Sequence, residues 1–365
     1  MTAAPPPSVR DVLLARLDAG SRPGARTDEH KLVLAVEGGG MRGAVSAGML
    51  LALEQLGLRD SFDEVVGTSA GAIAGAFFVV EQGTKGSSMY YTVLNSQRFV
   101  DRRRLVRSGP VLDIDWLIRE AFDTQGFDWS GLVQSNVPLW AVVSPAEADN
   151  DTSVFRVGET VERARDVLVA TASIPVVAGP SKLIDGAAYV DGGMIEAVPW
   201  RTAMQRGATH VLAIRSRRWV EDGRPEDYNL FERTTVPRLV RRTHGDHVTD
   251  LVNDSPDRFF VNTESLRAIV DGDGCPIDQG TARPVVFDAV LPAPEVALPD
   301  RLEVDTHVLM DALAAGAQAM IDHLNIEGFG VEQRVVVTHP RALVGPVRKN
   351  ALTPIVKDRR QQTRP

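Results

Sequence analysis

The sequence predicts a three-layer α/β/α fold with a mostly parallel central sheet. Two strand-to-helix units that follow each other in the chain support this prediction. An apolar, β-favouring run at residues 31–36 precedes a helical pattern at residues 44–58, and a second run at residues 62–66 precedes an apolar helix at residues 70–80. Such alternation is typical of an open, largely parallel sheet.

The first unit carries a glycine-rich loop between its strand and its helix. Apolar residues at three- and four-residue spacing indicate the helix: Val45, Met49, Ala52, Leu53 and Leu56. The loop before it reads Gly38-Gly39-Gly40-Met41-Arg42-Gly43. Free backbone N–H groups at a helix N-terminus can face an anion. Arg42 could contact a phosphate group or brace the loop against a backbone carbonyl, and we favour bracing.

The second unit places a serine between glycines, in the run Gly67-Thr68-Ser69-Ala70-Gly71. A tight strand-to-helix turn holds its central residue in a strained backbone conformation, and only small neighbours fit around it. The Ser69 hydroxyl then projects above the N-terminus of the next helix, where the helix dipole favours negative charge. The run therefore predicts a nucleophile elbow at Ser69, with Gly67 and Gly71 as the small neighbours.

The two loops are expected side by side at the carboxyl edge of neighbouring parallel strands, where open α/β sheets bind ligands. Gly38, Gly40 and Gly43 also match a dinucleotide-binding fingerprint, which requires an acidic residue at the end of the second strand. That position holds Gly67-Thr68-Ser69 instead. An oxyanion hole explains the glycines better, because backbone donors can approach a developing negative oxygen without obstruction.

A general base for Ser69 is expected among the carboxylates and not among the histidines. None of the seven histidines stands in a convincing strand-end loop: His30, His210, His244, His247, His307, His323 and His339. Asp185-Gly186 separates two short β-like runs and predicts a hairpin turn. Asp191 follows a strand end, and Gly192 and Gly193 behind it allow a close approach to another loop. We predict that Asp191 accepts the Ser69 proton directly; a second turn aspartate is the alternative.

Together these motifs resemble the patatin-like acyl hydrolases (patatin-like phospholipases) of the bacterial type. The glycine loop, the serine elbow and the Asp191-Gly192-Gly193 motif stand in the family's order, and Ala172-Ser173-Ile174-Pro175 and Pro199 with residues 207–212 look similar. Specific motifs cover residues 31–216, and a looser resemblance continues to about residue 330. The resemblance implies a patatin-like fold, a Ser–Asp dyad, an oxyanion hole from the first loop, and release of fatty acid from lipid esters.

Two other functions stay open at this point. A Ser-His-Asp α/β-hydrolase esterase would also use Ser69 but would need one of the histidines. A non-catalytic protein that binds a lipid or a nucleotide would keep the fold without turnover. A carboxylate can serve as the sole base only if its pKa is raised and the pair is shielded from bulk water.

Composition agrees with an ordinary enzyme: the chain has 365 residues, of which 44% are hydrophobic and 24% charged. A net charge of −8 argues against nucleic acid as a partner. The single cysteine, Cys275, and the lack of a visible secretory signal predict a cytoplasmic protein. We expect no cofactor and no metal, a lipid ester as substrate, and at most a transient, peripheral contact with a membrane surface.

The predicted domain organisation has three parts. Residues 1–30 are expected to be a flexible N-terminal segment, because they begin rich in proline and turn polar. Residues 31–335 are expected to form the catalytic domain, in which residues 219–300 carry no recognisable motif and could shape the substrate site. Residues 336–365 form a basic tail, which can touch acidic lipid head groups but is more often solvated.

Overall fold

The computed structural model describes residues 5–107, 109–147, 151–219, 230–272 and 284–325. Within them, eight strands form one sheet in the order β5-β6-β3-β2-β1-β7-β8, with β4 paired to β3 off this path. The strands are β1 (Leu32–Val36), β2 (Glu64–Thr68), β3 (Leu139–Pro145), β4 (Ser153–Val157), β5 (Lys182–Ile184), β6 (Ala187–Asp191), β7 (His210–Ile214) and β8 (Val286–Val290).

The centre of this sheet is parallel and one side of it is antiparallel. Strands β3, β2, β1, β7 and β8 run parallel, whereas β4 and β6 pair antiparallel with β3, and β5 pairs antiparallel with β6. The prediction of a mostly parallel central sheet is therefore confirmed. All five residues of β1 and of β7 are buried, as expected for strands covered on both faces.

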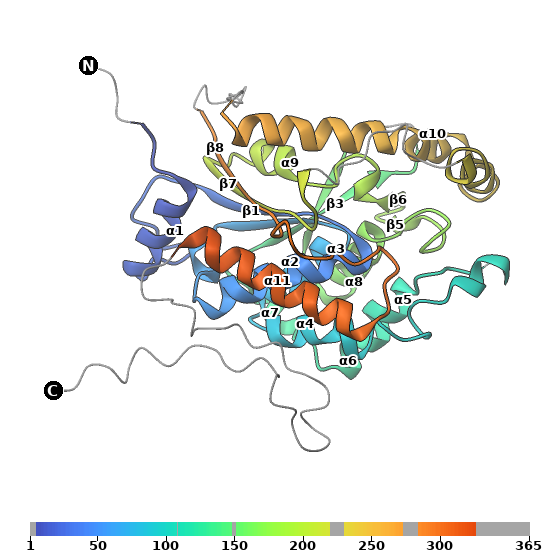
Figure 1. The fold of residues 1–365 in the computed structure, drawn as a ribbon, viewed down its shortest axis with the longest axis horizontal. Coiled ribbons are helices and arrows are strands. Elements are labelled where there is room, and N and C mark those ends of the chain that lie inside the picture. The colour runs from blue at the N-terminus through green and yellow to red at the C-terminus, as the bar shows by residue number, and fades with distance from the viewer. Residues whose placement is uncertain (1–4, 108, 148–150, 220–229, 273–283, 326–365) are drawn as a thin grey trace.

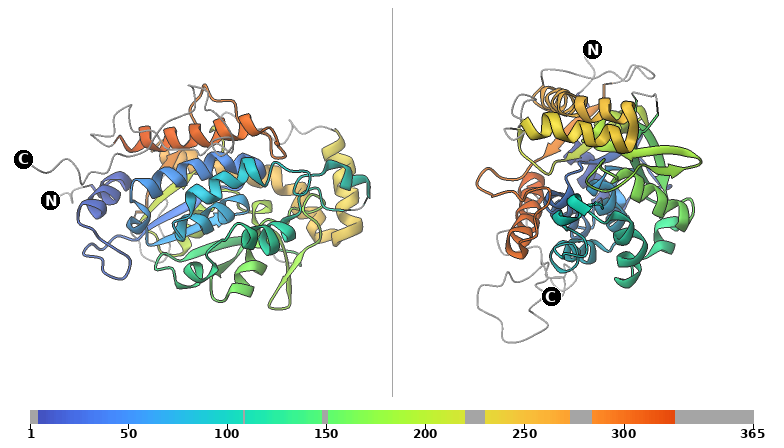
Figure 2. Two further views of the ribbon diagram at one scale, coloured as in Figure 1. Left: turned by 90° about the horizontal axis from the view of Figure 1, so that it is seen from below. Right: turned by 90° about the vertical axis from the view of Figure 1, so that its right-hand side faces the viewer.

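Helices cover both faces of the sheet and complete the three layers (Figure 1). They are α1 (Val9–Asp18), α2 (Gly43–Gln55), α3 (Ala70–Val79), α4 (Gly83–Thr92), α5 (Ile114–Trp116), α6 (Phe122–Thr124), α7 (Trp129–Gln134), α8 (Val161–Thr171), α9 (Trp200–Gln205), α10 (Leu230–Val270) and α11 (Thr306–Leu324). Shorter turns are η1 (Gly40–Arg42), η2 (Arg59–Ser61), η3 (Arg102–Arg107), η4 (Leu117–Ala121) and η5 (Gly192–Met194). The α9 and α10 helices lie over one face, and α2, α3, α4, α8 and α11 lie on the other, as two further views also show (Figure 2). No helix within the described ranges is both long and apolar enough to cross a bilayer.

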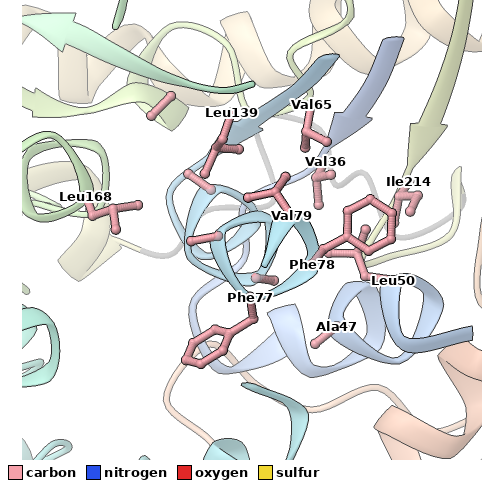
Figure 3. Packing of buried hydrophobic residues seen from close by; sticks show 14 of the residues in the cluster. Val36, Ala47, Leu50, Val65, Phe77, Phe78, Val79, Leu139, Leu168 and Ile214 are labelled. Atoms are coloured by element: carbon pink, nitrogen blue, oxygen red, sulfur yellow. The ribbon is translucent and has the colours of Figure 1, made fainter. Parts of the chain in front are cut away.

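Helix α3 forms the centre of the larger core, between the sheet and α2. Figure 3 shows Val36 and Val65 on strands on one side of α3, and Ala47 and Leu50 on α2 on its other side. The helix carries alanine and glycine at many positions, so the elements on both sides can approach it closely. The backbone that carries Ser69 is thus held by packing on two sides.

Strand β2 begins and ends two residues later than the predicted run at residues 62–66. Asp63 lies immediately before the strand, and its carboxylate accepts hydrogen bonds from the Leu32 N–H at 2.8 Å and from Arg16 and Arg26. At the other end, Gly67 pairs with Val36 of β1. The strand therefore runs up to the residue before Ser69.

The N-terminal segment is packed onto the domain where the sequence predicts a flexible one. Helix α1 begins with a capping box between Ser8 and Asp11, and its Leu13 is fully buried. Arg16, only 2% exposed, forms ion pairs with Asp28 and Asp63. These contacts tie the segment to the start of β2. The basic tail predicted for residues 336–365 lies outside the described residues, and so does Cys275.

The predicted hairpin at Asp185-Gly186 is confirmed. Strands β5 and β6 pair antiparallel on either side of it, and both turn residues have positive φ, 52° and 84°. This is the backbone that the favoured two-residue hairpin turn requires. Asp185 is exposed and pairs with Arg163, so it is a turn residue on the surface.

Candidate active site

Ser69 has a strained backbone at the junction of β2 and α3. Its φ of 54° and ψ of −125° are rare for a residue with a side chain and are maintained only by the surrounding structure. A β-carbon on Gly71 would sit 2.3 Å from the Val36 carbonyl oxygen, and one on Gly67 would sit 2.5 Å from the Ala72 backbone. Both neighbours must therefore be glycine. The elbow has the geometry expected of a nucleophile turn.

The glycine loop lies directly beside Ser69. Because Val36 pairs with Gly67, the residues after β1 and β2 emerge at the same edge of the sheet. A β-carbon on Gly38 would lie 2.9 Å from the Thr68 carbonyl oxygen and 3.1 Å from the Ser69 Cβ. The predicted side-by-side arrangement of the two loops is thus present.

The loop's backbone donors are not equivalent. Gly38 N–H donates to the Ala197 carbonyl at 3.1 Å, and Met41 N–H donates to the Arg301 carbonyl at 3.0 Å. The N–H groups of Arg42 and Gly43 bond within the loop. Among the described residues, the N–H groups of Gly39 and Gly40 have no hydrogen-bond partner.

Two residues other than the motif's glycines, Glu37 and Arg42, fix the shape of this loop. Glu37 is fully buried, accepts the Ser216 N–H at 2.7 Å and lies between Arg215 and Arg217. Arg42 donates through Nε to the Pro299 carbonyl at 3.2 Å, which is the bracing contact that we favoured from the sequence. The loop is therefore anchored to the end of β7 on one side and to the segment before α11 on the other.

Asp191 ends β6 and is 3% exposed. Its backbone N–H donates to the Ser173 carbonyl at 3.0 Å, and its Oδ1 accepts the Gly193 N–H at 2.7 Å. Gly192 has to be glycine, because an added β-carbon would lie 2.3 Å from the Val142 carbonyl oxygen. The Oδ2 atom is buried and has no hydrogen-bond partner in the described part of the chain.

Burial raises the pKa of Asp191 from 3.8 to about 6. The Ser69 side chain, the Gly193 N–H and the charge of Arg301 each oppose this increase in the pKa. Ser69 is thus close enough to act on the carboxyl group, although no hydrogen bond of normal length and angle joins the two described side chains. Catalytic hydrogen bonds are often loose in a free enzyme and tighten when substrate binds.

A three-residue segment at the end of α8 holds both Ser69 and Asp191. The Thr171 hydroxyl accepts the Ser69 N–H at 3.0 Å and donates to the Val142 carbonyl at 2.5 Å. Two residues later, the Ser173 carbonyl accepts the Asp191 N–H. Sequence reasoning noted residues 172–175 but gave them no role and missed Thr171. The only signal in the sequence was that motif's position immediately after Thr171.

An apolar cavity opens beside Ser69. Its walls come from the glycine loop, α3, α4 and the segments around residues 99, 112–117 and 172–174. The wall residues are Gly40, Met41, Ser69, Ala70, Ile73, Tyr90, Leu94, Phe99, Leu112, Ile114, Leu117, Ala172 and Ile174. None of the six histidines in the described ranges contributes to these walls, and His339 lies outside those ranges. The site therefore combines a serine, a buried carboxylate and an apolar surface.

The histidines instead have contacts elsewhere in the fold. His210 is a buried strand residue that bonds the Pro7 carbonyl, and burial lowers its pKa. His244 bonds the Gly179 carbonyl, and His323 bonds Asp288. His307 lies in the first turn of α11.

The described part of residues 219–300 supports the Asp191 turn. Val240, Val248 and Leu251 of α10 form a core cluster with Val190 of β6, next to Asp191. No described residue of α10 lines the cavity beside Ser69. The segment that contacts the glycine loop lies just beyond α10 and β8, where the Arg301 carbonyl accepts the Met41 N–H.

The fold and this site are those of the class of α/β proteins that carry a serine elbow at the carboxyl edge of a parallel sheet. Residues 34–204 match the family model described as patatin-like phospholipase, and this part of the chain is a patatin-like domain. The match includes Ser69, Asp191 and the whole glycine loop.

Named relatives are similar over about half of this chain. The protein YjjU of Escherichia coli is 29% identical over 189 residues, which are 51% of this chain and 52% of that protein. Patatin-like phospholipase domain-containing protein 7 of Rattus norvegicus is 30% identical over 51% of this chain, but only 13% of its own length is covered. Neuropathy target esterase sws of Drosophila melanogaster is 28% identical over 51% of this chain and 13% of its own length. Matches thus span about half of the first of these proteins and a small part of the others.

Proposed function

We propose that this protein is a serine acyl hydrolase that releases fatty acid from lipid esters through Ser69 and Asp191. The match to the patatin-like phospholipase family suggests activity on lipid esters, as the names of its relatives do for those proteins. One observation carries the proposal most: a buried carboxylate with a raised pKa and a free oxygen lies beside a strained serine that opens into an apolar cavity.

In this proposal Ser69 Oγ attacks the ester carbonyl carbon while Asp191 Oδ2 takes the hydroxyl proton. The negative oxygen that develops is stabilised by the free N–H groups of Gly39 and Gly40. The carbon–oxygen bond to the alcohol then breaks, and the Asp191 proton moves to the leaving oxygen. An acyl group remains on Ser69.

Hydrolysis of this acyl-enzyme reverses the roles. Asp191 takes a proton from water, the resulting hydroxide adds to the acyl carbon, and the fatty acid leaves as Ser69 regains its proton. With a pKa of about 6, the Asp191 carboxylate is ionised at neutral pH and is still a stronger base than an exposed aspartate. The apolar walls beside Ser69 suit the hydrocarbon part of such a substrate.

The test compares wild type, Ser69→Ala and Asp191→Asn on p-nitrophenyl esters and on phospholipids, with circular dichroism as the check of folding. We expect kcat to fall about 10²- to 10⁴-fold for Asp191→Asn and at least as far for Ser69→Ala. Asp185→Asn is the matched control, because it changes an exposed aspartate on the β5–β6 turn. Full activity of Asp191→Asn would exclude the dyad. Failure of a fluorophosphonate to label Ser69 in the folded wild type would instead favour a non-catalytic protein.

A further inference from the structure

A second apolar cavity lies next to the one that contains Ser69. The two cavities share four wall residues, Ile73, Tyr90, Leu94 and Leu117. The space between atoms is about 430 Å³ in the cavity beside Ser69 and about 390 Å³ in the second, including the part open to solvent. Because the same side chains bound both spaces, a ligand that fills the first can continue into the second when these side chains turn.

Helix α3 gives the direction and the length of this path. Ala70 and Ile73 line the first cavity, and Ile73, Ala74 and Phe77 line the second. With a rise of 1.5 Å per residue, the distance along α3 from Ser69 to Phe77 is about 12 Å. Carbon–carbon bonds of about 1.5 Å advance an extended chain by roughly 1.3 Å each, so about nine or ten carbons cover this distance.

The second cavity has the chemistry of a hydrocarbon site. Its far wall consists of Ala47 and Leu50 of α2, Phe77 of α3, and Phe122. Ala47 and Leu50 face α3 in Figure 3, and Phe77 lies on the side of α3 away from the strands. The Ser87 hydroxyl in the wall already donates to the Ala47 carbonyl at 3.4 Å. Water finds few partners in such a space, whereas an apolar chain gains contacts.

We propose that the acyl chain of the substrate extends past Ile73 into the second cavity, so that the wall formed by α2 and α3 sets the preferred chain length. The preferred ester then has an acyl chain of about ten carbons, and shorter chains leave the second cavity empty. This inference rests on the proposed function, because the chain is anchored through its ester carbonyl at Ser69. Ala47 and Ala74 are the positions at which a larger side chain would fill the second cavity alone.

The experiment measures kcat/KM for p-nitrophenyl esters of two to sixteen carbons with the full chain. Wild type should gain up to about fourfold per added methylene until the chain reaches about ten carbons. Ala74→Leu and Ala47→Leu should keep the four-carbon rate within about threefold and lose at least tenfold on the ten- and twelve-carbon esters. Ala315→Leu, on a partly exposed position of α11 outside both cavities, is the matched control.

Two results would overturn the inference. One is an unchanged chain-length profile in both folded variants; the other is an equal loss on four- and twelve-carbon esters. Binding of dodecanoate to Ser69→Ala, measured by calorimetry, tests the cavity without turnover. It should weaken at least tenfold when Ala74→Leu is added, and equal binding would also refute the inference. A wild type that hydrolyses no ester but binds dodecanoate in this way would refute the proposed function alone.

Discussion

Thr171→Val tests whether the hydroxyl at the end of α8 positions Ser69, the proposed nucleophile. Valine has nearly the shape of threonine but cannot accept the Ser69 N–H or donate to the Val142 carbonyl. Two buried backbone groups then lose their partner, at about 1–3 kcal/mol each, so we expect about 2–6 kcal/mol less stability. The strained φ of 54° at Ser69 loses one of the contacts that maintain it.

The catalytic effect should be larger than a general loss of stability explains. A displacement of the nucleophile by about 1 Å can cost about 10²-fold, so we expect kcat to fall about 10- to 100-fold with little change in KM. Thr171→Ser keeps the hydroxyl and should restore most of kcat. The assay is steady-state hydrolysis of a p-nitrophenyl ester below the unfolding temperature, together with the rate of fluorophosphonate labelling.

Thr263→Val is the matched control for this prediction. Thr263 is also fully buried in a helix, its hydroxyl donates to the Phe259 carbonyl one turn earlier in α10, and neither residue lines the cavity beside Ser69. The Thr263→Val protein should be less stable than wild type but keep its kcat. Equal kcat values for Thr171→Val and wild type would refute the positioning role, and so would a Thr171→Ser protein as slow as Thr171→Val.

Three further predictions follow from charged groups. Because Asp191 must be ionised to act as a base, kcat/KM should be flat above pH 6 and fall about tenfold per pH unit below it. Arg301→Gln should move this fall in kcat/KM to higher pH, whereas Arg103→Gln should leave it in place; an unchanged pH profile for Arg301→Gln would contradict an effect of the Arg301 charge on the Asp191 pKa. Burial raises the pKa of Glu54 to about 7, so the stability that its neutral form provides is lost as pH rises through 7. In thermal unfolding, the free energy of unfolding of Glu54→Gln should exceed that of wild type by roughly 2 kcal/mol at pH 8.5 and match it at pH 5; equal stability of the two proteins at both pH values would contradict this prediction. Arg16→Met leaves two carboxylates without their buried partner and should cost about 3–5 kcal/mol in urea unfolding; a loss below about 1 kcal/mol would show that the network adds little.

Local patterns in the sequence were sufficient for the elements that depend on near neighbours. The β-like run before the glycine loop, the apolar helix after Ser69 and the Asp185-Gly186 turn are all present within two or three residues of their predicted positions. Each of these is decided by side chains a few positions apart. Contacts with distant groups were not predicted, such as those of the Asp63 carboxylate with the Leu32 N–H and two arginines at the start of β2.

Some features of the predicted site stay predictions from the sequence. The roles of Ser69, Asp191 and the glycine loop in catalysis await the variants described above. The cytoplasmic location and a transient contact with a membrane surface are likewise expectations from composition.

The sequence by itself determined that Ser69 stands at a strand-to-helix turn and that its motifs resemble those of the patatin-like family, because both depend on contiguous motifs. Only the tertiary structure decided what surrounds that serine. Burial in the folded chain raises the pKa of Asp191, and Thr171 reaches Ser69 across 102 positions of the chain. Of the loop's donors, only those of Gly39 and Gly40 stay free in the described residues, because distant carbonyls take the N–H groups of Gly38 and Met41. Such long-range pairings set burial and hydrogen bonding, and no short motif encodes them.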